Sequence, residues 1–272
     1  MLGTSKDATR GVFGPVEATL LNSTGQSQSG LSDSGATDCP AREGELRPTN
    51  SILASLPRDE FNRLKPHLQG VSFCRGKVVR DVADHFDSLC FPLAGMIGLF
   101  SVMADGGTAV LAATGREGFL GVGALLAAEM APLRAVVLVE GHGLNLTSKN
   151  LPRVLPGAPH FAAALRCYSN KYLAQVHQIG ACHALHIVQQ RVASWLLMVR
   201  ERSDSDSLPL THDSLSEMLG CRRPSVTDAL SALEKTGLIR RSRGRIIIRN
   251  REELADQACE CYAVLRDRGA FE

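Results

Sequence analysis

A stretch of arginines and hydroxyl side chains near the C-terminus has the chemistry to bind a polyanion. Residues 209–250 hold eight Lys or Arg against four Asp or Glu, a local charge of +4 in a chain whose total is +2. Such a concentration is typical of a phosphate-binding surface. Guanidinium and hydroxyl groups also form hydrogen bonds with base edges. The predicted partner is double-stranded DNA, and the predicted contacts are Arg222, Arg223, Ser225, Thr227, Asp228, Thr211, Arg241, Arg243 and Arg245.

Two short helices joined at Gly220 are expected to position these side chains. Apolar residues recur at helical spacing on both sides of the glycine, at Leu215, Met218 and Leu219 and then at Val226, Ala229, Leu230 and Leu233. Glycine takes positive φ without a steric clash, which suits the corner of a helix-turn-helix. Pro224 fits only the first turn of a helix, so the second helix is predicted to start near Arg222.

The start of that second helix enters the major groove first in DNA-binding versions of the motif. We therefore expect Arg223, Ser225 and Thr227 to contact base edges, with Arg223 able to grip a guanine through two hydrogen bonds. Asp228 either accepts from a cytosine amine or pairs with a nearby arginine. Arg222 and the other predicted contacts would hold phosphates.

A basic β-hairpin is predicted after the second helix. Thr236-Gly237 ends the helix, and short strands at Leu238-Ile239 and Arg245–Ile248 flank the turn Ser242-Arg243-Gly244. The stretch is thus predicted to be a winged helix that binds DNA. The alternative is a ligand-binding or protein-interaction module whose winged helix has a solvated basic face and does not touch DNA.

The N-terminal half contains a Gly- and Ser-rich segment followed by a β-rich one. Residues 1–49 lack an apolar period and are predicted to be a disordered tail. Turn signals such as Asp105-Gly106-Gly107 then separate short β-rich runs, and Gly118–Pro132 is expected to hold a loop and one short helix. Many short strands indicate a sandwich or jelly roll. The predicted runs are Val71–Cys74, Lys77–Asp81, Leu89–Phe91, Met96–Met103, Thr108–Ala113, Arg134–Val139 and Leu144–Thr147.

Helices are predicted on either side of the basic stretch. The helix Pro159–Ala184 carries a narrow apolar stripe, Phe161, Leu165, Tyr168, Tyr172, Val176 and Ile179. It has little of its own domain to pack on, so we expect a second copy of the chain to cover the stripe, the alternative being a core helix within one chain. Helices are also expected at His186–Arg202 and at Glu252–Arg268.

Composition and cysteine spacing favour a cytoplasmic protein without a membrane partner. The chain of 272 residues is 44% hydrophobic and 21% charged, as is typical of globular proteins, and no apolar run approaches a membrane span. Six of the eight cysteines are scattered singly, and the pair Cys259 and Cys261 alone is a weak metal signal. We expect reduced, mostly buried thiols, with a redox role of the pair left as a hypothesis. No enzyme is expected, because His142 is the only histidine in the later strands and cupin chemistry needs several.

The chain resembles the Crp/Fnr superfamily of bacterial transcription regulators from about Asn50 to Tyr262. The residues that carry the resemblance are LTHDSLSEMLGCRRPSVTDALSALEKTGLI, the following RGRI and the ACECY ending, with weaker support from FPLAGMIGLFSV and REGFLGVGALL. The resemblance implies an α+β fold with a homodimer that binds an inverted-repeat operator, RNA polymerase as a further partner, and a small-molecule effector. Its parts would be a cyclic-nucleotide-binding-like β-roll at 50–157, a dimerisation helix at 158–184 and a winged helix-turn-helix domain at 185–272.

The chain departs from family members that respond to cyclic AMP. Those members have a Gly-Glu-Leu helix and an Arg-Ser pair, where this chain has Gly121-Val122-Gly123 and Arg134-Ala135. The resemblance leaves Gly121 and Arg134 as candidate ligand-binding residues, but it does not predict cyclic AMP, since a buried ligand hydroxyl without a partner costs about 1 to 3 kcal/mol. Arg134 either clamps an anion or pairs with a carboxylate. No cofactor is assigned, because the N-terminal cysteine cluster of oxygen-sensing members is missing.

Overall fold

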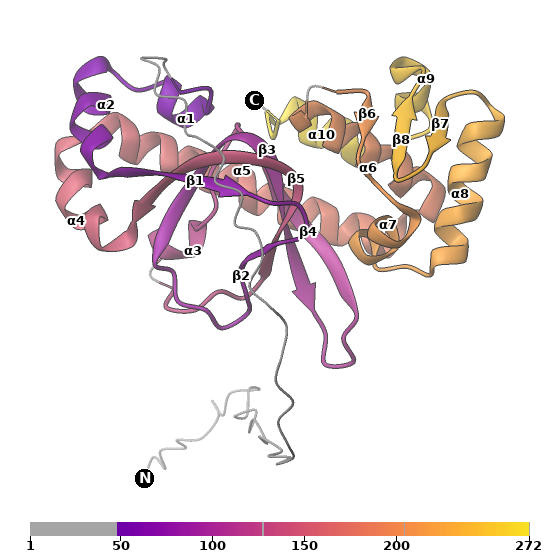
Figure 1. Cartoon of the computed structure of the whole chain (residues 1–272), viewed down its shortest axis with the longest axis horizontal. Coiled ribbons are helices and arrows are strands. Elements are labelled where there is room, and N and C mark those ends of the chain that lie inside the picture. The colour runs from indigo at the N-terminus through magenta and orange to yellow at the C-terminus, as the bar shows by residue number, and fades with distance from the viewer. Residues whose placement is uncertain (1–47, 127, 204, 272) are drawn as a thin grey trace, which may run out of the picture. The chain divides into compact units, whose positions relative to one another are not determined.

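The computed structural model describes residues 48–126, 128–203 and 205–271. The predicted tail, residues 1–49, lies outside these ranges apart from Pro48 and Thr49, and Cys39 lies outside them too. A β-rich part comes first and a helical part follows (Figure 1). The β-rich part contains α1 Ser51–Ala54, α2 Arg58–Leu64, η1 Lys65–His67, β1 Leu68–Phe73, β2 Val78–Arg80, β3 Ser88–Val102, β4 Thr108–Thr114, α3 Val122–Leu125, β5 Arg134–Thr147, η2 Ser148–Asn150, α4 Leu151–Val154 and η3 Leu155–Gly157. The rest comprises α5 Pro159–Leu185, α6 Val188–Ser203, β6 Ser207–Leu208, α7 His212–Leu219, α8 Arg223–Lys235, β7 Ile239–Ser242, β8 Arg245–Ile248, α9 Arg251–Asp256 and α10 Glu260–Asp267.

The β-rich part is an antiparallel sheet in the order β1, β5, β3, β4, with β2 also paired to β5. Two long strands, β3 and β5, replace the two pairs of short runs that the sequence predicted. The predicted hairpin at Asp105-Gly106-Gly107 is confirmed and joins β3 to β4. The predicted short helix within Gly118–Pro132 is α3.

Bulges explain why β3 and β5 continue through the positions where the sequence predicted that a strand would end. The pairing of β3 with β5 shifts register three times between Pro92 and Ile97, so the strands bend while they stay hydrogen bonded. Gly95 has a φ of +87°, and a Cβ there would lie 2.7 Å from the carbonyl oxygen of Val139. Glycine therefore permits a close crossing that other residues would block.

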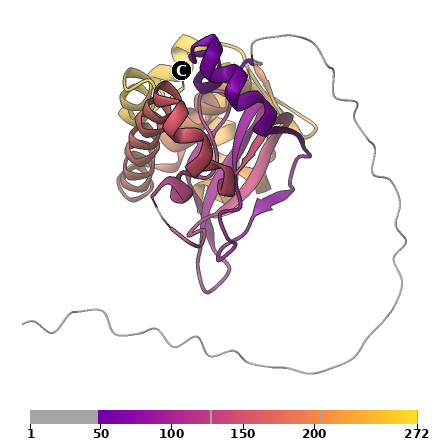
Figure 2. The same cartoon turned by 90° about the vertical axis from the view of Figure 1, so that its left-hand side faces the viewer.

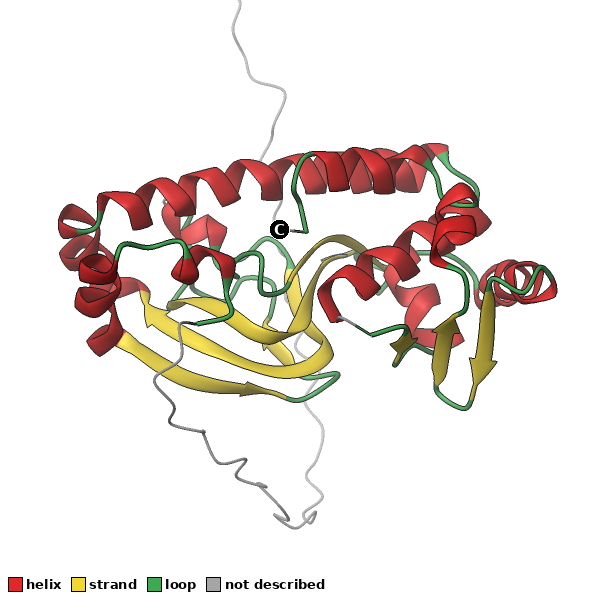
Figure 3. Ribbon diagram, turned by 90° about the horizontal axis from the view of Figure 1, so that it is seen from above, coloured by secondary structure: helices red, strands yellow, loops and turns green. Residues whose placement is uncertain are grey.

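Helix α5 packs its apolar stripe on the sheet of its own chain, so the expectation that a second copy covers this stripe is wrong. Phe161, Leu165, Tyr168 and Ile179 are buried, and Tyr172 and Val176 pack against the same cores. Figure 3 shows α5 running along the sheet and on toward the helical part. The helix can pack there because β4 and the loop after it supply an apolar face from the chain itself.

The N-terminus of α5 is held by the short helices that precede the sheet, which Figure 2 shows from their own side. Glu60 of α2 is 4% exposed, and its carboxylate accepts hydrogen bonds from the backbone N–H groups of His160 and Phe161. These N–H groups have no partner within the helix, and the negative charge lies at the positive end of the helix dipole. Burial opposes ionisation of Glu60, but these hydrogen bonds and that of the His160 ring lower its pKa overall.

The helical part confirms the predicted helix-turn-helix and hairpin. The strand β6, which the sequence did not predict, pairs with β8 and completes a three-stranded sheet with β7. The single helix expected at Glu252–Arg268 is two helices, α9 and α10, with a break at Gln257 to Cys259. Leu254, Cys261 and Leu265 are buried, as predicted.

Buried polar contacts attach the sheet to the helical part. Arg202, in the last turn of α6, forms an ion pair of 2.6 Å with Glu117 in the loop after β4, and both side chains are at most 2% exposed. The guanidinium also donates to the carbonyl oxygens of Ala113 and Ala270.

None of the helices in the described ranges combines the length and the apolarity that crossing a membrane requires.

A second set of contacts runs from β4 to α7. The ring of His183 in α5 lies 2.7 Å from the carbonyl oxygen of Val110, and its other nitrogen contacts the guanidinium of Arg191 in α6. Arg191 donates in turn to the carbonyl oxygen of Leu219 in α7. Burial and the charge of Arg191 lower the pKa of His183, so the neutral ring is favoured. This arrangement needs a neutral His183, because the nitrogen that faces Arg191 must accept a hydrogen bond.

Candidate functional site

The first helix of the helix-turn-helix, α7, is capped at both ends by its own sequence. The hydroxyl of Thr211 accepts from the N–H of Ser214, and the hydroxyl of Ser214 accepts from the N–H of Thr211, which forms a capping box. Gly220 ends the helix with a φ of +57°, as the corner requires. The structure thus gives the Thr211 hydroxyl a capping role at the position where a phosphate contact was predicted.

The N-terminus of the second helix, α8, is exposed. Arg222 is its N-cap, Arg223 is its first residue and Pro224 lies in its first turn, as the sequence predicted. Arg222, Arg223 and Asp228 are exposed, and Ser225 and Thr227 are half-buried. Within the described ranges, the side chains of Arg222 and Asp228 form no hydrogen bond or ion pair. The exposed guanidinium of Arg223 forms an ion pair of 2.6 Å with Asp213 of α7.

A histidine that the sequence did not single out, His212, lies under this surface. Its Nδ1 is 2.9 Å from the hydroxyl of Thr227, which also donates to the carbonyl oxygen of Arg223. Partial burial and the charges of Arg241 and Arg223 lower the pKa of His212. At the His212 ring, burial and the two arginines thus outweigh the opposing effect of the carboxylates of Asp213 and Glu234.

The wing is attached to α8 through Arg241. Its backbone N–H and its Nε each donate to the carboxylate of Glu234 at 2.7 Å, and its Nη1 donates to Ser231 at 3.2 Å. These hydrogen bonds lower the pKa of Glu234. Arg243 is exposed at the tip of the hairpin, and Arg245, also exposed, reaches Ser207 at 3.3 Å. Arg241 thus positions the wing, and Arg243 and Arg245 present charge to solvent.

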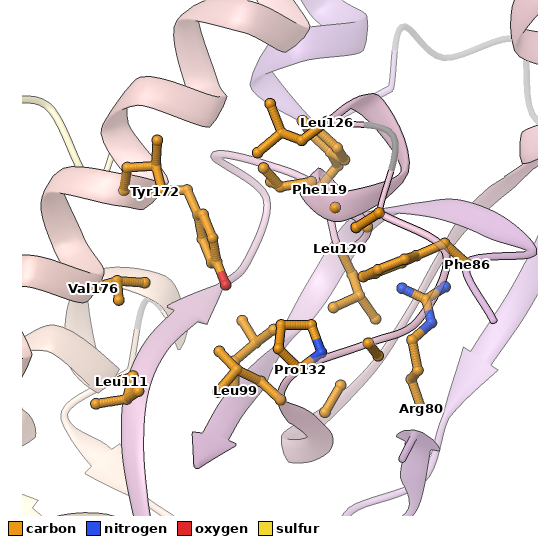
Figure 4. Close-up of a pocket in the computed structure, with 18 residues that line it drawn as sticks. Arg80, Phe86, Leu99, Leu111, Phe119, Leu120, Leu126, Pro132, Tyr172 and Val176 are labelled. Carbon is orange, nitrogen blue, oxygen red and sulfur yellow. The ribbon is translucent and has the colours of Figure 1, made fainter. Parts of the chain in front are cut away.

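A separate cavity of about 380 Å³ lies between the sheet and α5 (Figure 4). Its lining is almost entirely apolar and includes Phe86, Leu99 and Leu120 from the sheet side and Tyr172 and Val176 from α5. The lining includes Gly121, one of the two candidate ligand-binding residues. The other, Arg134, is not in it. Arg134 instead forms a two-point ion pair with Asp81, which lowers the pKa of that carboxyl, and so takes the carboxylate partner that was its predicted alternative.

The cation of this cavity is Arg80, which the sequence analysis missed. Arg80 is 8% exposed, its Nη2 donates to the carbonyl oxygen of Ser88 at 2.8 Å, and its guanidinium lies 4.9 Å from the centre of the Phe86 ring. Its Nη1 is buried without a hydrogen-bond partner in the described part of the chain. A single arginine inside the run Val78-Val79-Arg80 was the available signal, since a charged residue in a buried strand needs a partner.

Comparisons with known proteins support the sequence resemblance. Residues 190–257 match a family model described as a Crp-like helix-turn-helix domain. No curated protein sequence matches the chain.

Solved structures of this type share the fold. FixK2 from Bradyrhizobium japonicum matches with a TM-score of 0.61 at 17% identity, over 71% of this chain and 98% of that one. The c-di-GMP responsive global regulator CLP from Xanthomonas campestris gives 0.61 at 16% identity, over 71% and 99%. A CRP-family transcriptional regulator from Thermus thermophilus gives 0.59 at 18%, over 69% and 96%. The chain therefore has the fold of the Crp/Fnr transcription regulators and carries a Crp-like helix-turn-helix domain, as its sequence predicted.

Proposed function

We propose that the protein is a homodimeric transcription regulator that binds an inverted-repeat DNA operator through α8. The observation that carries the proposal is the exposed start of α8, where Arg222 and Arg223 are open to solvent, together with the exposed Arg243 of the hairpin that packs on α8 through Arg241. This is the end of the helix that enters the major groove in such motifs. Arg223, Ser225 and Thr227 would contact bases, and Arg222, Arg243 and Arg245 would contact phosphates.

The ion pair of Arg223 with Asp213 leaves Arg223 able to bind DNA. Both side chains are exposed, so the pair contributes little to stability and its partners can separate at low cost. On DNA, a guanine base would offer Arg223 two hydrogen-bond acceptors in a fixed geometry in place of Asp213, and this contact would distinguish guanine from other bases. A phosphate could also replace Asp213, but it would not distinguish one base sequence from another. Arg241 is assigned to positioning the wing, because its guanidinium is already bound to Glu234 and Ser231.

Gel-shift titrations of promoter fragments at two salt concentrations test DNA binding. Affinity must fall steeply with salt if phosphates are neutralised. Arg223→Ala should weaken the preferred sequence by about 1 to 3 kcal/mol and relax preference at one base pair, and Arg243→Ala should weaken all sequences alike. Arg63→Ala is the matched control, because Arg63 is an exposed arginine on α2, at the opposite end of Figure 1 from α8.

Each outcome has a clear consequence. Equal losses on every sequence for Arg223→Ala and Arg243→Ala would reject the division of roles. Failure to bind any fragment, or binding that does not depend on salt, would favour the protein-interaction module instead.

The dimer would use exposed apolar residues of α5 and of the turn that follows it. Leu173 of α5 is 39% exposed and also lines the cavity, Leu185 at the end of α5 is 77% exposed, and Ile187 in the turn after α5 is 66% exposed. Exposed large apolar residues are typical of an interface. A second copy is the proposed partner, since two-fold symmetry of the protein matches the symmetry of an inverted repeat.

Sedimentation equilibrium tests the dimer. The full chain should sediment as a dimer at micromolar concentration, and Leu173→Glu should shift it toward the monomer. Met103→Glu is the control, because Met103 is a comparably exposed apolar residue at the β3–β4 hairpin, away from α5. A monomeric full chain, or equal effects of the two variants, would contradict this interface.

We further propose that the cavity beside α5 gates DNA binding by taking an apolar ligand with an acidic head group. The unpartnered Nη1 of Arg80 supports this, since an arginine keeps its charge when buried and an anion would complete its hydrogen bonds.

Calorimetry with decanoate and with decanol tests the charge requirement. Decanoate should bind better, and Arg80→Met should remove the difference while the surface variant Arg134→Met retains it. Equal binding of acid and alcohol would refute the acidic head group.

A further inference from the structure

Three cysteines and one histidine converge where α5 meets the C-terminal helix α10. Cys182 and His186 come from the end of α5 and the residue after it, and Cys259 and Cys261 come from the start of α10. One ligand atom from each of the four residues lies within 4.8 Å of all the others. The metal signal in the sequence is weak because the two ligand pairs, Cys182 with His186 and Cys259 with Cys261, lie 73 positions apart, counted from His186 to Cys259.

Two of the distances within this cluster are those expected in a tetrahedral thiolate site. The sulfur atoms of Cys182 and Cys259 are 3.5 Å apart, and Sγ of Cys261 is 3.5 Å from Nδ1 of His186. Zinc bonds of about 2.3 Å to sulfur and 2.0 Å to nitrogen at tetrahedral angles place such atoms roughly 3.5 to 3.8 Å apart. A disulfide would need sulfur atoms about 2.05 Å apart, so the geometry is that of separate ligands.

Polar groups around the cluster orient its members. Nε2 of His186 lies 3.1 Å from the carboxylate of Glu260, which points Nδ1 toward Cys261. The hydroxyl of Ser194 lies 3.1 Å from Sγ of Cys259, and Nε2 of Gln178 donates to Sγ of Cys261 at 3.1 Å. Such partners of the ligand atoms are typical of metal sites, where they fix the ring orientation and stabilise the thiolates.

An apolar cluster of unreactive thiols is the ordinary explanation for buried cysteines. Cys182, Cys259 and Cys261 are indeed buried, but an apolar cluster has no need of Ser194, Gln178 and a carboxylate-oriented histidine.

We propose that Cys182, His186, Cys259 and Cys261 bind one Zn²⁺ ion as a structural site with three thiolates and one imidazole. The ion would tie the turn between α5 and α6 to α10, and so fix the direction in which the helix-turn-helix leaves α5. Binding deprotonates the thiols and releases their protons, so the affinity should fall as pH is lowered. The proposal does not depend on the DNA-binding proposal, because its first readouts are spectroscopic.

Cobalt substitution of the full-length protein, prepared with reductant and stripped of metal, tests the site. Addition of Co²⁺ should give the intense visible bands of a tetrahedral thiolate complex, and Zn²⁺ should displace it at one ion per chain. Zn²⁺ at a thousandfold excess over its Kd should raise Tm by on the order of 10 °C. Zn²⁺ should also protect three thiols from a thiol reagent.

Cysteine variants provide the matched comparison. Cys261→Ser should lose the cobalt bands, while Cys74→Ser, which removes an exposed cysteine outside the cluster, should retain them. If Cys261→Ser does not fold, the wild-type spectrum and thiol protection decide alone. The weak bands of octahedral Co²⁺, equal thiol reactivity with and without Zn²⁺, or a Cys182 to Cys259 disulfide that forms without bound metal would each overturn the proposal.

Discussion

Removing the charge of Arg202 should destabilise the fold far more than removing that of Arg200, a more exposed arginine of the same helix. The Arg202 side chain is 0% exposed, and its Nε lies 2.6 Å from the carboxylate of Glu117. Arg202→Met leaves Glu117 as a buried charge whose remaining hydrogen-bond partner within the described ranges is the N–H of Gly115. Breaking a buried ion pair in this way costs about 3 to 5 kcal/mol, because the orphaned charge keeps its desolvation cost.

The surface ion pair of Arg200 with Asp206 provides the matched control. Arg200 lies two residues earlier on α6, and the two side chains of this pair are 28% and 57% exposed. Exposed pairs contribute about 0 to 1 kcal/mol, since water screens them and ordering two long side chains has an entropy cost. Arg200→Met should therefore change the free energy of unfolding little.

Urea denaturation followed by circular dichroism gives the free energy of unfolding of both variants, and thermal unfolding gives their Tm. For a domain of this size, the loss expected for Arg202→Met corresponds to a fall in Tm of roughly 6 to 20 °C. The double variant Arg202→Met with Glu117→Gln should cost less than the sum of the two single changes, because neither charge is left unpaired. If Arg202→Met and Arg200→Met have equal effects, or the double variant is additive, the argument from burial is wrong.

Three further predictions concern the elements that hold the DNA-binding part and α5 in place. The pKa of His183 is lowered in the folded chain, so the stabilisation that the neutral ring provides should be complete above pH 6.5 and be lost as pH falls through the pKa of the folded state. Urea midpoints measured against pH should show this loss, and His183→Gln should remove that part of the pH dependence. Glu60→Gln should lower the free energy of unfolding by about 1 to 3 kcal/mol near neutral pH and have little effect in acid, where the wild-type carboxyl is protonated; an equal loss at both pH values would contradict the charged cap. A methyl group on Gly118 would lie 1.9 Å from the Tyr168 ring, so Gly118→Ala should cost about 1 to 3 kcal/mol or more, whereas Gly157→Ala, at a glycine with open space around it, should not change the thermal midpoint.

The sequence was sufficient to predict the helix-turn-helix because each of its signals is local. Gly220, Pro224 and Gly237 determine where α7 ends, where α8 begins and where α8 ends, since each acts on the backbone at its own position. The apolar spacing within each helix then fixes which side chains face inward. The exposure of Arg222 and Arg223 follows from those two facts alone.

Contacts between distant segments could not be predicted in the same way. Arg80 and Arg134 both stand in or beside strand runs, and only the folded sheet shows that Arg134 meets Asp81 while Arg80 is left inside a cavity. The stripe on α5 shows the same limit. Its narrow width was compatible with a core helix or with an interface, and the choice depended on whether the sheet reached that far along the helix.

Helix α5 takes part in three of the proposals, the dimer, the cavity ligand and the zinc site. Tyr172 and Val176 line the cavity, Leu173 also lines it but is 39% exposed, and Cys182 lies beside the turn into α6. A ligand in the cavity can change DNA binding only if it binds one arrangement of this helix more tightly than another. The buried contacts of Arg202 and His183 attach α6 and α7 to the sheet of the same chain, so they oppose separate movement of the helical part. If the chain forms the proposed dimer, the arrangement that a ligand changes is therefore expected to be the packing of α5 against the second copy, with the helical part moving together with its own sheet.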